Sequence, residues 1–220
     1  MAFANYPGGF SPAENRAGNP WNQAEHLYYI PSTDTNQYAL GDAVTIQTGS
    51  DPDGVPAVVK ITTPASQVAI GVITGIRVAD PGVSLQGPDL TLSVIQIPAT
   101  KTRGYYVYVV EDPDVIFEIP TDLVTIANLV NSTTTPTSLI AANKNASYIV
   151  NNPTGTSPYS GTVLSTASIA GGSPSSTLPL KIIGMQVRPD NLLTNPLNGV
   201  PIRLRVMWNT HVWFGSQAGV

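Results

Sequence analysis

Only two residues of this sequence, His26 and His211, have the imidazole group that most often acts as a general base near neutral pH. They lie near opposite ends of the chain, and neither belongs to a recognisable catalytic motif. The sequence also has no G-x-S-x-G nucleophile elbow, Walker A loop, G-x-G-x-x-G fingerprint or H-E-x-x-H helix. The histidines are therefore interpreted as packed or exposed side chains without a catalytic role.

Carboxylates concentrate in one segment, which contains Glu111, Asp112, Asp114 and Glu118. Such a cluster could bind Ca²⁺ or form the carboxylate pair of a glycosidase. A calcium loop spaces its oxygen ligands regularly around a glycine, whereas this segment contains a proline and continues into an apolar strand. It is interpreted as a turn, as is Asp51-Pro-Asp53-Gly54. We therefore predict no catalytic, cofactor-binding or metal-binding residue, and an enzyme that uses the Glu111 to Glu118 carboxylates is the least favoured alternative.

The composition limits the classes of partner. Charged residues make up only 11% of the chain, and its 10 Lys and Arg residues are scattered, so no basic patch is available to neutralise phosphates. The chain has no cysteine, which excludes disulfides and thiolate metal sites. The N-terminus lacks the features of a secretory signal, and no stretch approaches the roughly 18 apolar residues of a membrane-spanning helix. We expect no nucleic-acid or membrane partner, and cytoplasmic synthesis without secretion.

The elements that would position any functional residue are predominantly strands. Residues 68–78 alternate with period two, so one face is expected to be core, and Gly71 and Gly75 on the other face allow a close backbone approach or a bend. The apolar phase slips between Val94 and Ile95, which predicts a β-bulge. Residues 104–110 are apolar on both faces and predict a central strand, which could form a hairpin with residues 115–119.

The C-terminal strand is predicted from strict alternation. Val200, Ile202, Leu204, Val206 and Trp208 share one face. The opposite face has polar, cationic and aromatic residues: Pro201, Arg203, Arg205, Met207, Asn209 and, if the extended chain continues, His211 and Trp213. Proline within a strand indicates a sheet edge, because its missing N–H does not break the ladder there. This edge is expected either to be solvated or to be a contact strip.

Other segments differ from this strand pattern. Residues 1–26 combine proline and glycine with Phe3, Tyr6, Phe10 and Trp21, and predict an extended arm whose aromatic side chains anchor it on a neighbouring surface; the alternative is a frayed terminus. Residues 121–130 have the spacing of one short helix, and residues 131–178 form a Ser/Thr/Gly/Pro-rich insertion. We predict an all-β protein: an antiparallel β-barrel or jelly-roll-like sandwich over residues 27–220, preceded by the arm.

Three blocks in this order resemble a known family: GYYVYVVEDPDVIFEIP (104–120), LKIIGMQVRPDN (180–191) and IRLRVMWNTHVW (202–213). They are similar to the head decoration, or cement, proteins of tailed bacteriophages, and the resemblance spans roughly residues 28–213. It implies a β-barrel or jelly-roll protein on the outer surface of the capsid lattice of a virion. The implied partners are the major capsid protein and sister copies in a homo-oligomer, with a trimer favoured over a dimer. No catalytic residue is implied.

The expected partner contacts come from the arm and from the C-terminal strip: Tyr6, Phe10, Trp21, Arg203, Arg205 and Trp213. Two further functions remain open besides the enzyme. One is a carbohydrate- or receptor-binding module of the virion, for which Tyr105, Tyr106, Tyr108 and Trp208 could supply rings. The other is a major capsid or tail-tube subunit, which would also be charge-poor and β-rich. A neutral polar surface with aromatic anchors favours the decoration protein, because it buries an interface at modest desolvation cost.

Overall fold

The computed structural model describes residues 8–77, 96–122, 145–153, 157–165, 167–168, 177–185 and 202–214. In this part of the chain every named element is a strand, so the predicted all-β class is confirmed. The strands are β1 (Ser11–Asn15), β2 (His26–Ile30), β3 (Ala43–Ser50), β4 (Pro56–Lys60), β5 (Gly71–Arg77), β6 (Tyr105–Val110), β7 (Val115–Pro120), β8 (Asn145–Ala146), β9 (Tyr148–Ile149), β10 (Val163–Leu164), β11 (Leu180–Met185) and β12 (Arg203–Trp208).

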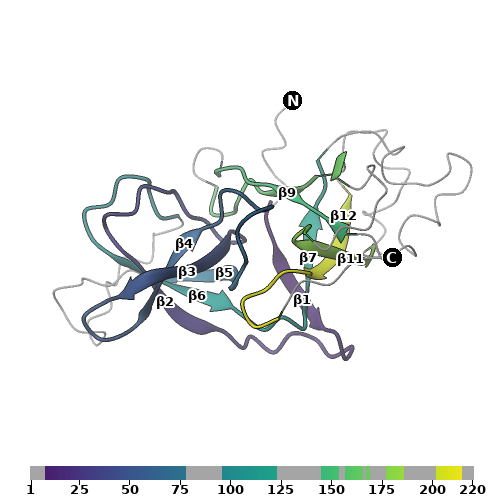
Figure 1. The fold of residues 1–220 in the computed structure, drawn as a ribbon, viewed down its shortest axis with the longest axis horizontal. Coiled ribbons are helices and arrows are strands. Elements are labelled where there is room, and N and C mark those ends of the chain that lie inside the picture. Colours follow the sequence, from purple (N-terminus) through teal and green to yellow (C-terminus); the bar gives the residue numbers. More distant parts are fainter. Residues whose placement is uncertain are drawn as a thin grey trace, which may run out of the picture.

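Five strands close into a barrel in the order β2-β4-β3-β5-β6, on the left in Figure 1. All neighbours are antiparallel except β2 and β4, which are parallel. β-Branched residues such as Val44, Val58 and Val107 are completely buried inside. The close approach predicted at Gly71 is confirmed, because a Cβ atom there would lie 2.1 Å from the carbonyl oxygen of Val110. The ladder between β5 and β6 shifts register between Ile73 and Gly75.

The second sheet has the order β1-β7-β12-β11-β8, and its pairs are antiparallel (right in Figure 1). The alternation predicted for the C-terminal strand is present in β12, where Leu204, Val206 and Trp208 are buried and the residues between them are partly exposed. These side chains belong to a second core, a hydrophobic cluster that also includes Ala43, Val72 and Val110 from strands of the barrel. The described strands thus form the barrel, this five-stranded sheet and a two-stranded sheet of β9 and β10, and the second core combines side chains of the barrel and of the five-stranded sheet.

Two predictions about strand pairing are wrong. β12 is not an edge strand, because it pairs with β7 on one side and β11 on the other. The ladder begins at Arg203, and Pro201 lies outside the described residues. β6 and β7 do not form a hairpin, since β6 belongs to the barrel and β7 to the other sheet. The segment between them is a turn, as predicted, with the Val115 N–H donating to the Asp112 carbonyl at 3.2 Å.

The described part of the predicted arm is integrated into the sheet. β1 pairs with β7 along residues 11–15, and the Phe10 ring is only 3% exposed. Phe10 packs against the rings of Phe117, Tyr148 and Trp208, with centroid separations of 6.0, 5.2 and 5.1 Å. Burial of a large aromatic ring therefore fixes this segment on its own chain. The predicted bulge at Val94, residues 123–130 of the predicted short helix and most of the insertion lie outside the described residues.

Candidate functional site

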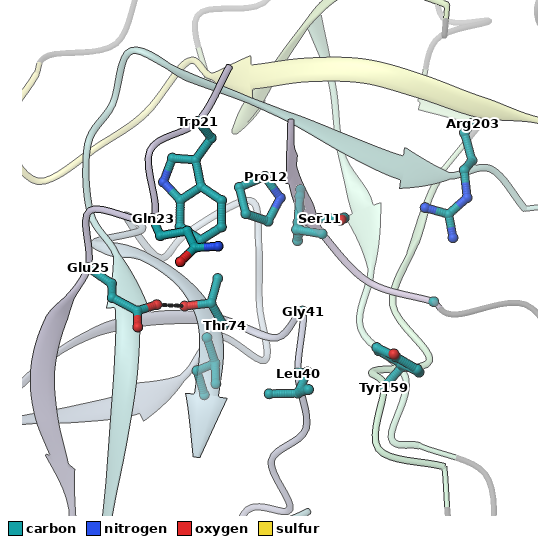
Figure 2. Close-up of a pocket in the computed structure, with 13 residues that line it drawn as sticks. Ser11, Pro12, Trp21, Gln23, Glu25, Leu40, Gly41, Thr74, Tyr159 and Arg203 are labelled. Atoms are coloured by element: carbon teal, nitrogen blue, oxygen red, sulfur yellow. Dashed lines mark hydrogen bonds between the residues drawn. The ribbon is translucent and has the colours of Figure 1, made fainter. Parts of the chain in front are cut away.

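A pocket of about 490 Å³ lies where the barrel, the second sheet and the N-terminal segment meet. We call it the junction pocket. Trp21, Gln23, Glu25 and Thr74 lie on one side of it in Figure 2, and Tyr159 and Arg203 on the other. Leu40, Gly41, Ile73 and Phe10 also line it. Its volume is within the range of small-molecule sites, which usually combine apolar walls with a few polar groups.

The first side of the pocket is built by the chain between β1 and β2 together with β5. Thr74 Oγ1 donates to Glu25 Oε2 at 2.6 Å, which orients that carboxylate (Figure 2). The backbone N–H of Trp21 donates to the Ala13 carbonyl at 3.2 Å, and the partly buried Trp21 side chain packs against the second core. Gln23 has φ of 62°, a conformation that non-glycine residues seldom adopt. Such backbone strain is concentrated at functional sites and turns.

The opposite side depends on a segment that is tied to the barrel. The Leu40 N–H donates to the Pro158 carbonyl at 2.9 Å, and the Ser160 N–H donates to the Leu40 carbonyl at 2.8 Å. These two bonds flank Tyr159, whose side chain is 44% exposed. Arg203 is the first residue of β12 and is partly buried. Tyr159 is therefore an exposed ring on a fixed backbone.

A buried ionic network lies beneath this segment. Asp42 is fully buried, and its Oδ1 accepts from Ser160 Oγ at 2.5 Å while its Oδ2 accepts from Lys60 Nζ at 2.9 Å. Lys60 Nζ also donates to the Gln37 carbonyl and to Asn152 Oδ1, so all three of its N–H groups have acceptors. Burial raises the pKa of the Asp42 carboxyl, against the opposing effect of the Lys60 ammonium. The network fixes both sides of the loop that presents Tyr159.

Gly41 allows the N-terminal segment to approach the barrel closely. Its φ is 87°, and a Cβ atom there would lie 3.0 Å from both the backbone nitrogen and the carbonyl oxygen of Phe10. The Phe10 N–H donates to the Gly41 carbonyl at 3.0 Å. Glycine is required at this position because it has no Cβ and adopts a positive φ without strain. Gly41 and Phe10 both line the junction pocket.

A second exposed feature follows β12. Residues 211–214 form a turn, closed by the Phe214 N–H donating to the His211 carbonyl at 3.0 Å, and we call it the aromatic turn. Trp213 and Phe214 are each 58% exposed, although both are large apolar side chains. The Val212 N–H donates to the Ala69 carbonyl at 3.0 Å and ties the turn to the barrel. The two rings are thus presented on a fixed backbone.

His211 anchors this turn from inside. It is 3% exposed, and its Nε2 lies 2.8 Å from the Ile70 carbonyl oxygen. Its Nδ1 accepts from the Trp213 N–H at 3.2 Å. A carbonyl oxygen can only accept, so Nε2 holds the proton and the imidazole is neutral. Burial lowers the pKa of His211, with the Ile70 carbonyl and the carboxylates of Glu111 and Asp112 acting in the opposite direction.

The residues predicted as partner contacts lie in different environments. Tyr6 lies outside the described residues. Phe10 is a core residue of its own chain, so its ring is not available to a partner. Trp21 and Arg203 line the junction pocket, and Arg205 forms an ion pair with Glu14 across the sheet. Trp213 is the most exposed of the described members of this set.

The acidic cluster of the sequence is dispersed by the fold. Glu111 accepts from Tyr28 Oη and lies 2.5 Å from His26 Nδ1, and burial raises the pKa of Tyr28. Asp114 lies 3.6 Å from Arg16, whereas Glu118 is buried in β7. Among the described residues, no three His, Cys, Asp or Glu side chains are grouped so that they could hold a metal ion. The turn interpretation of Asp51 is supported, because its Oδ1 accepts from the N–H groups of Asp53 and Val55.

Sequence reasoning missed most of the junction pocket. Gln23, Glu25, Thr74 and Tyr159 come from three separate segments, and no spacing between them indicates a shared site. Two other lining residues, Trp21 and Arg203, had been predicted as partner contacts. Among the missed residues, the local signal was Tyr159, a large aromatic within a Ser/Thr/Gly/Pro-rich stretch.

In the part of the chain that the structure describes, no helix has the length and apolarity needed to cross a membrane. Comparisons with protein-family models, curated proteins and solved structures found no match.

Proposed function

We propose that this chain is a non-enzymatic structural protein of a bacteriophage virion, which binds the outer surface of the capsid and bridges neighbouring capsid subunits. The observation that most supports this function is the aromatic turn. Exposed, contiguous apolar side chains on a soluble chain are characteristic of protein interaction sites. Aromatic residues are also the side chains most enriched at the energetic centres of such interfaces.

The aromatic turn is preorganised for binding. Three backbone N–H groups within residues 212–214 already have acceptors, namely the Ala69 carbonyl, His211 Nδ1 and the His211 carbonyl. Little backbone entropy is therefore lost when Trp213 and Phe214 enter a partner, which increases the net free energy of association. Burying one such ring fully contributes about 1.5–3 kcal/mol. In our proposal the acceptor is a hydrophobic recess on the major capsid protein.

The low charge of the chain supports the same role. A net charge of −4 over 220 residues gives little long-range repulsion between copies on a crowded lattice. Each copy contributes a modest free energy, and linkage of copies in a homo-oligomer, with a trimer favoured, raises the overall affinity by avidity. We propose a barrel rather than a jelly-roll arrangement for the domain, on the basis of the closed strand order β2-β4-β3-β5-β6. The proposed location is the capsid exterior.

Occupancy on purified heads that lack this protein tests the proposal. The double variant Trp213→Ala/Phe214→Ala should bind at least tenfold more weakly than the wild type, because two exposed anchors are removed. Ile46→Ala is the matched control, since Ile46 is also an exposed large apolar residue, 43% exposed, but lies on β3 of the barrel. Equal occupancy of the double variant and the control would reject the aromatic turn as the docking element. Failure of the wild type to bind heads would reject the function.

The second candidate is a carbohydrate- or receptor-binding module of the virion. The rings expected to form its platform are mostly unavailable, because Tyr105, Tyr106 and Trp208 are only 7%, 3% and 5% exposed. Tyr108 is partly buried. This candidate therefore depends on a different feature, the junction pocket, which has an aromatic residue on each side.

A further inference from the structure

We propose that the junction pocket binds a neutral saccharide, a binding activity distinct from attachment to the capsid. The pocket, of about 490 Å³, is lined by apolar, aromatic and hydrogen-bonding side chains. Saccharides present both apolar C–H faces and hydroxyl groups that donate and accept. A site with aromatic side chains and convergent polar groups is complementary to both.

Two rings supply the apolar contacts. Trp21 lies on one side of the pocket and Tyr159 on the other (Figure 2). Trp21 packs against the second core, and Tyr159 is held by backbone hydrogen bonds on both sides of it. Rings on fixed backbones lose little conformational entropy when they stack on a ligand. The two rings lie on opposite sides of the pocket, and in our proposal the saccharide lies between them.

The polar groups favour a neutral ligand. The side chains of Ser11, Gln23, Glu25 and Tyr159 provide a hydroxyl, an amide, a carboxylate and a phenol around the pocket. Thr74 orients the Glu25 carboxylate by donating to it. Glu25 and Arg203 are the only charged side chains among the described lining residues, and their charges cancel. Such a site does not favour phosphorylated or sialylated ligands, which need an excess of cationic groups.

The strained backbone supports this assignment. Gln23 keeps φ of 62° although it is neither glycine nor asparagine, the residues that adopt this region most readily. Its side chain lines the pocket beside the Trp21 indole (Figure 2). A strained residue at a pocket wall is typical of a preorganised binding group. We assign the Gln23 amide to hydrogen bonds with ring hydroxyls of the saccharide.

A glycan array that contains neutral and sialylated oligosaccharides tests the proposal with the full chain. We expect the wild type to bind one or more neutral glycans, and titration with the best one to show about tenfold weaker affinity for Tyr159→Ala. Tyr159 is exposed, so this variant should keep the fold, which circular dichroism verifies. Trp213→Ala is the matched control and should bind like the wild type. Gln23→Ala should weaken binding without changing the set of glycans bound.

The outcomes separate this inference from the proposed function. Binding to no glycan, binding to sialylated glycans alone, or unchanged affinity in Tyr159→Ala would each overturn the saccharide site. Tyr159→Ala should still occupy capsid heads like the wild type, because the aromatic turn is intact. Loss of head binding in this variant would show that the pocket contacts the capsid instead, and would also overturn the inference.

Discussion

Lys60 donates from Nζ to Oδ2 of Asp42 at 2.9 Å, and the two side chains are 3% and 0% exposed. The pair joins the loop before β3 to the end of β4, and Ser160 extends it to the segment that presents Tyr159. A buried ion pair adds little net stability relative to apolar residues, but it strongly penalises the loss of one partner. It therefore fixes which loops meet at the junction pocket.

Replacing Lys60 with methionine should destabilise the fold by about 3–5 kcal/mol, because the Asp42 carboxylate would stay buried without its cation. Urea denaturation measures this free energy of unfolding. The matched control is Arg16→Ala, which removes an ion pair with Asp114 whose side chains are 69% and 49% exposed. That change should cost less than about 1 kcal/mol. Similar losses for the two variants would show that the buried network does not have this structural role.

Gly71→Ala should disrupt the barrel more than Gly75→Ala. A methyl group at Gly71 would lie 2.1 Å from the Val110 carbonyl oxygen, which is backbone and part of the β5–β6 ladder. At Gly75 the nearest atom is Cδ2 of the Tyr108 side chain at 3.0 Å, which can move. We expect Gly71→Ala to cost more than about 3 kcal/mol, beyond the usual range for single substitutions. Equal melting temperatures for the two variants would contradict this account of the close approach.

Phe10→Ala should cost about 3–5 kcal/mol of stability, because it empties the centre of a cluster with Phe117, Tyr148 and Trp208. Phe214→Ala removes the same ring from an exposed position and should change stability by less than about 0.5 kcal/mol. Thermal and chemical denaturation of both variants provide the comparison. A neutral effect of Phe10→Ala would mean that the N-terminal segment detaches from the sheet.

Stability should decrease in mild acid because of His211. Burial lowers its pKa below the ordinary value of 6.5, so the unfolded chain takes up this proton at a higher pH than the folded chain. The contribution of neutral His211 is complete above about pH 6.5 and is lost as the pH falls toward the folded-state pKa, at no more than about 1.4 kcal/mol per pH unit. Protonation also removes the acceptor for the Trp213 N–H.

The difference in unfolding free energy between the wild type and His211→Gln, measured from pH 8 to pH 5, isolates this contribution. We expect the variant to be less stable at pH 8 and the gap to narrow toward pH 5, since only the wild type has the titrating imidazole. His26→Gln provides the comparison for the other histidine, whose side chain is 71% exposed and lies 2.5 Å from Glu111 Oε1. A gap that is independent of pH would exclude His211 as the source.

Local pattern was sufficient for some elements. Alternation predicted the buried face of β12, and the glycine spacing in residues 68–78 predicted the close approach at Gly71, because side-chain direction in a strand depends only on period two. Pro113 and the aspartates beside it predicted a turn, because proline and aspartate favour turns through their own backbone and side-chain geometry. Strand pairing was predicted less well. Neither the central place of β12 nor the separation of β6 from β7 can be derived from the residues of those strands alone.

The sequence by itself determined that this protein is built of strands, with few charges and no thiols, because composition and period act residue by residue. Only the tertiary structure decided that Phe10 is core and Trp213 surface, and that Trp21, Tyr159 and Arg203 face one pocket. The physical reason is that burial and convergence depend on contacts between segments far apart in the chain. The ring of Phe10 is buried by residues more than a hundred positions away, and no local pattern records them.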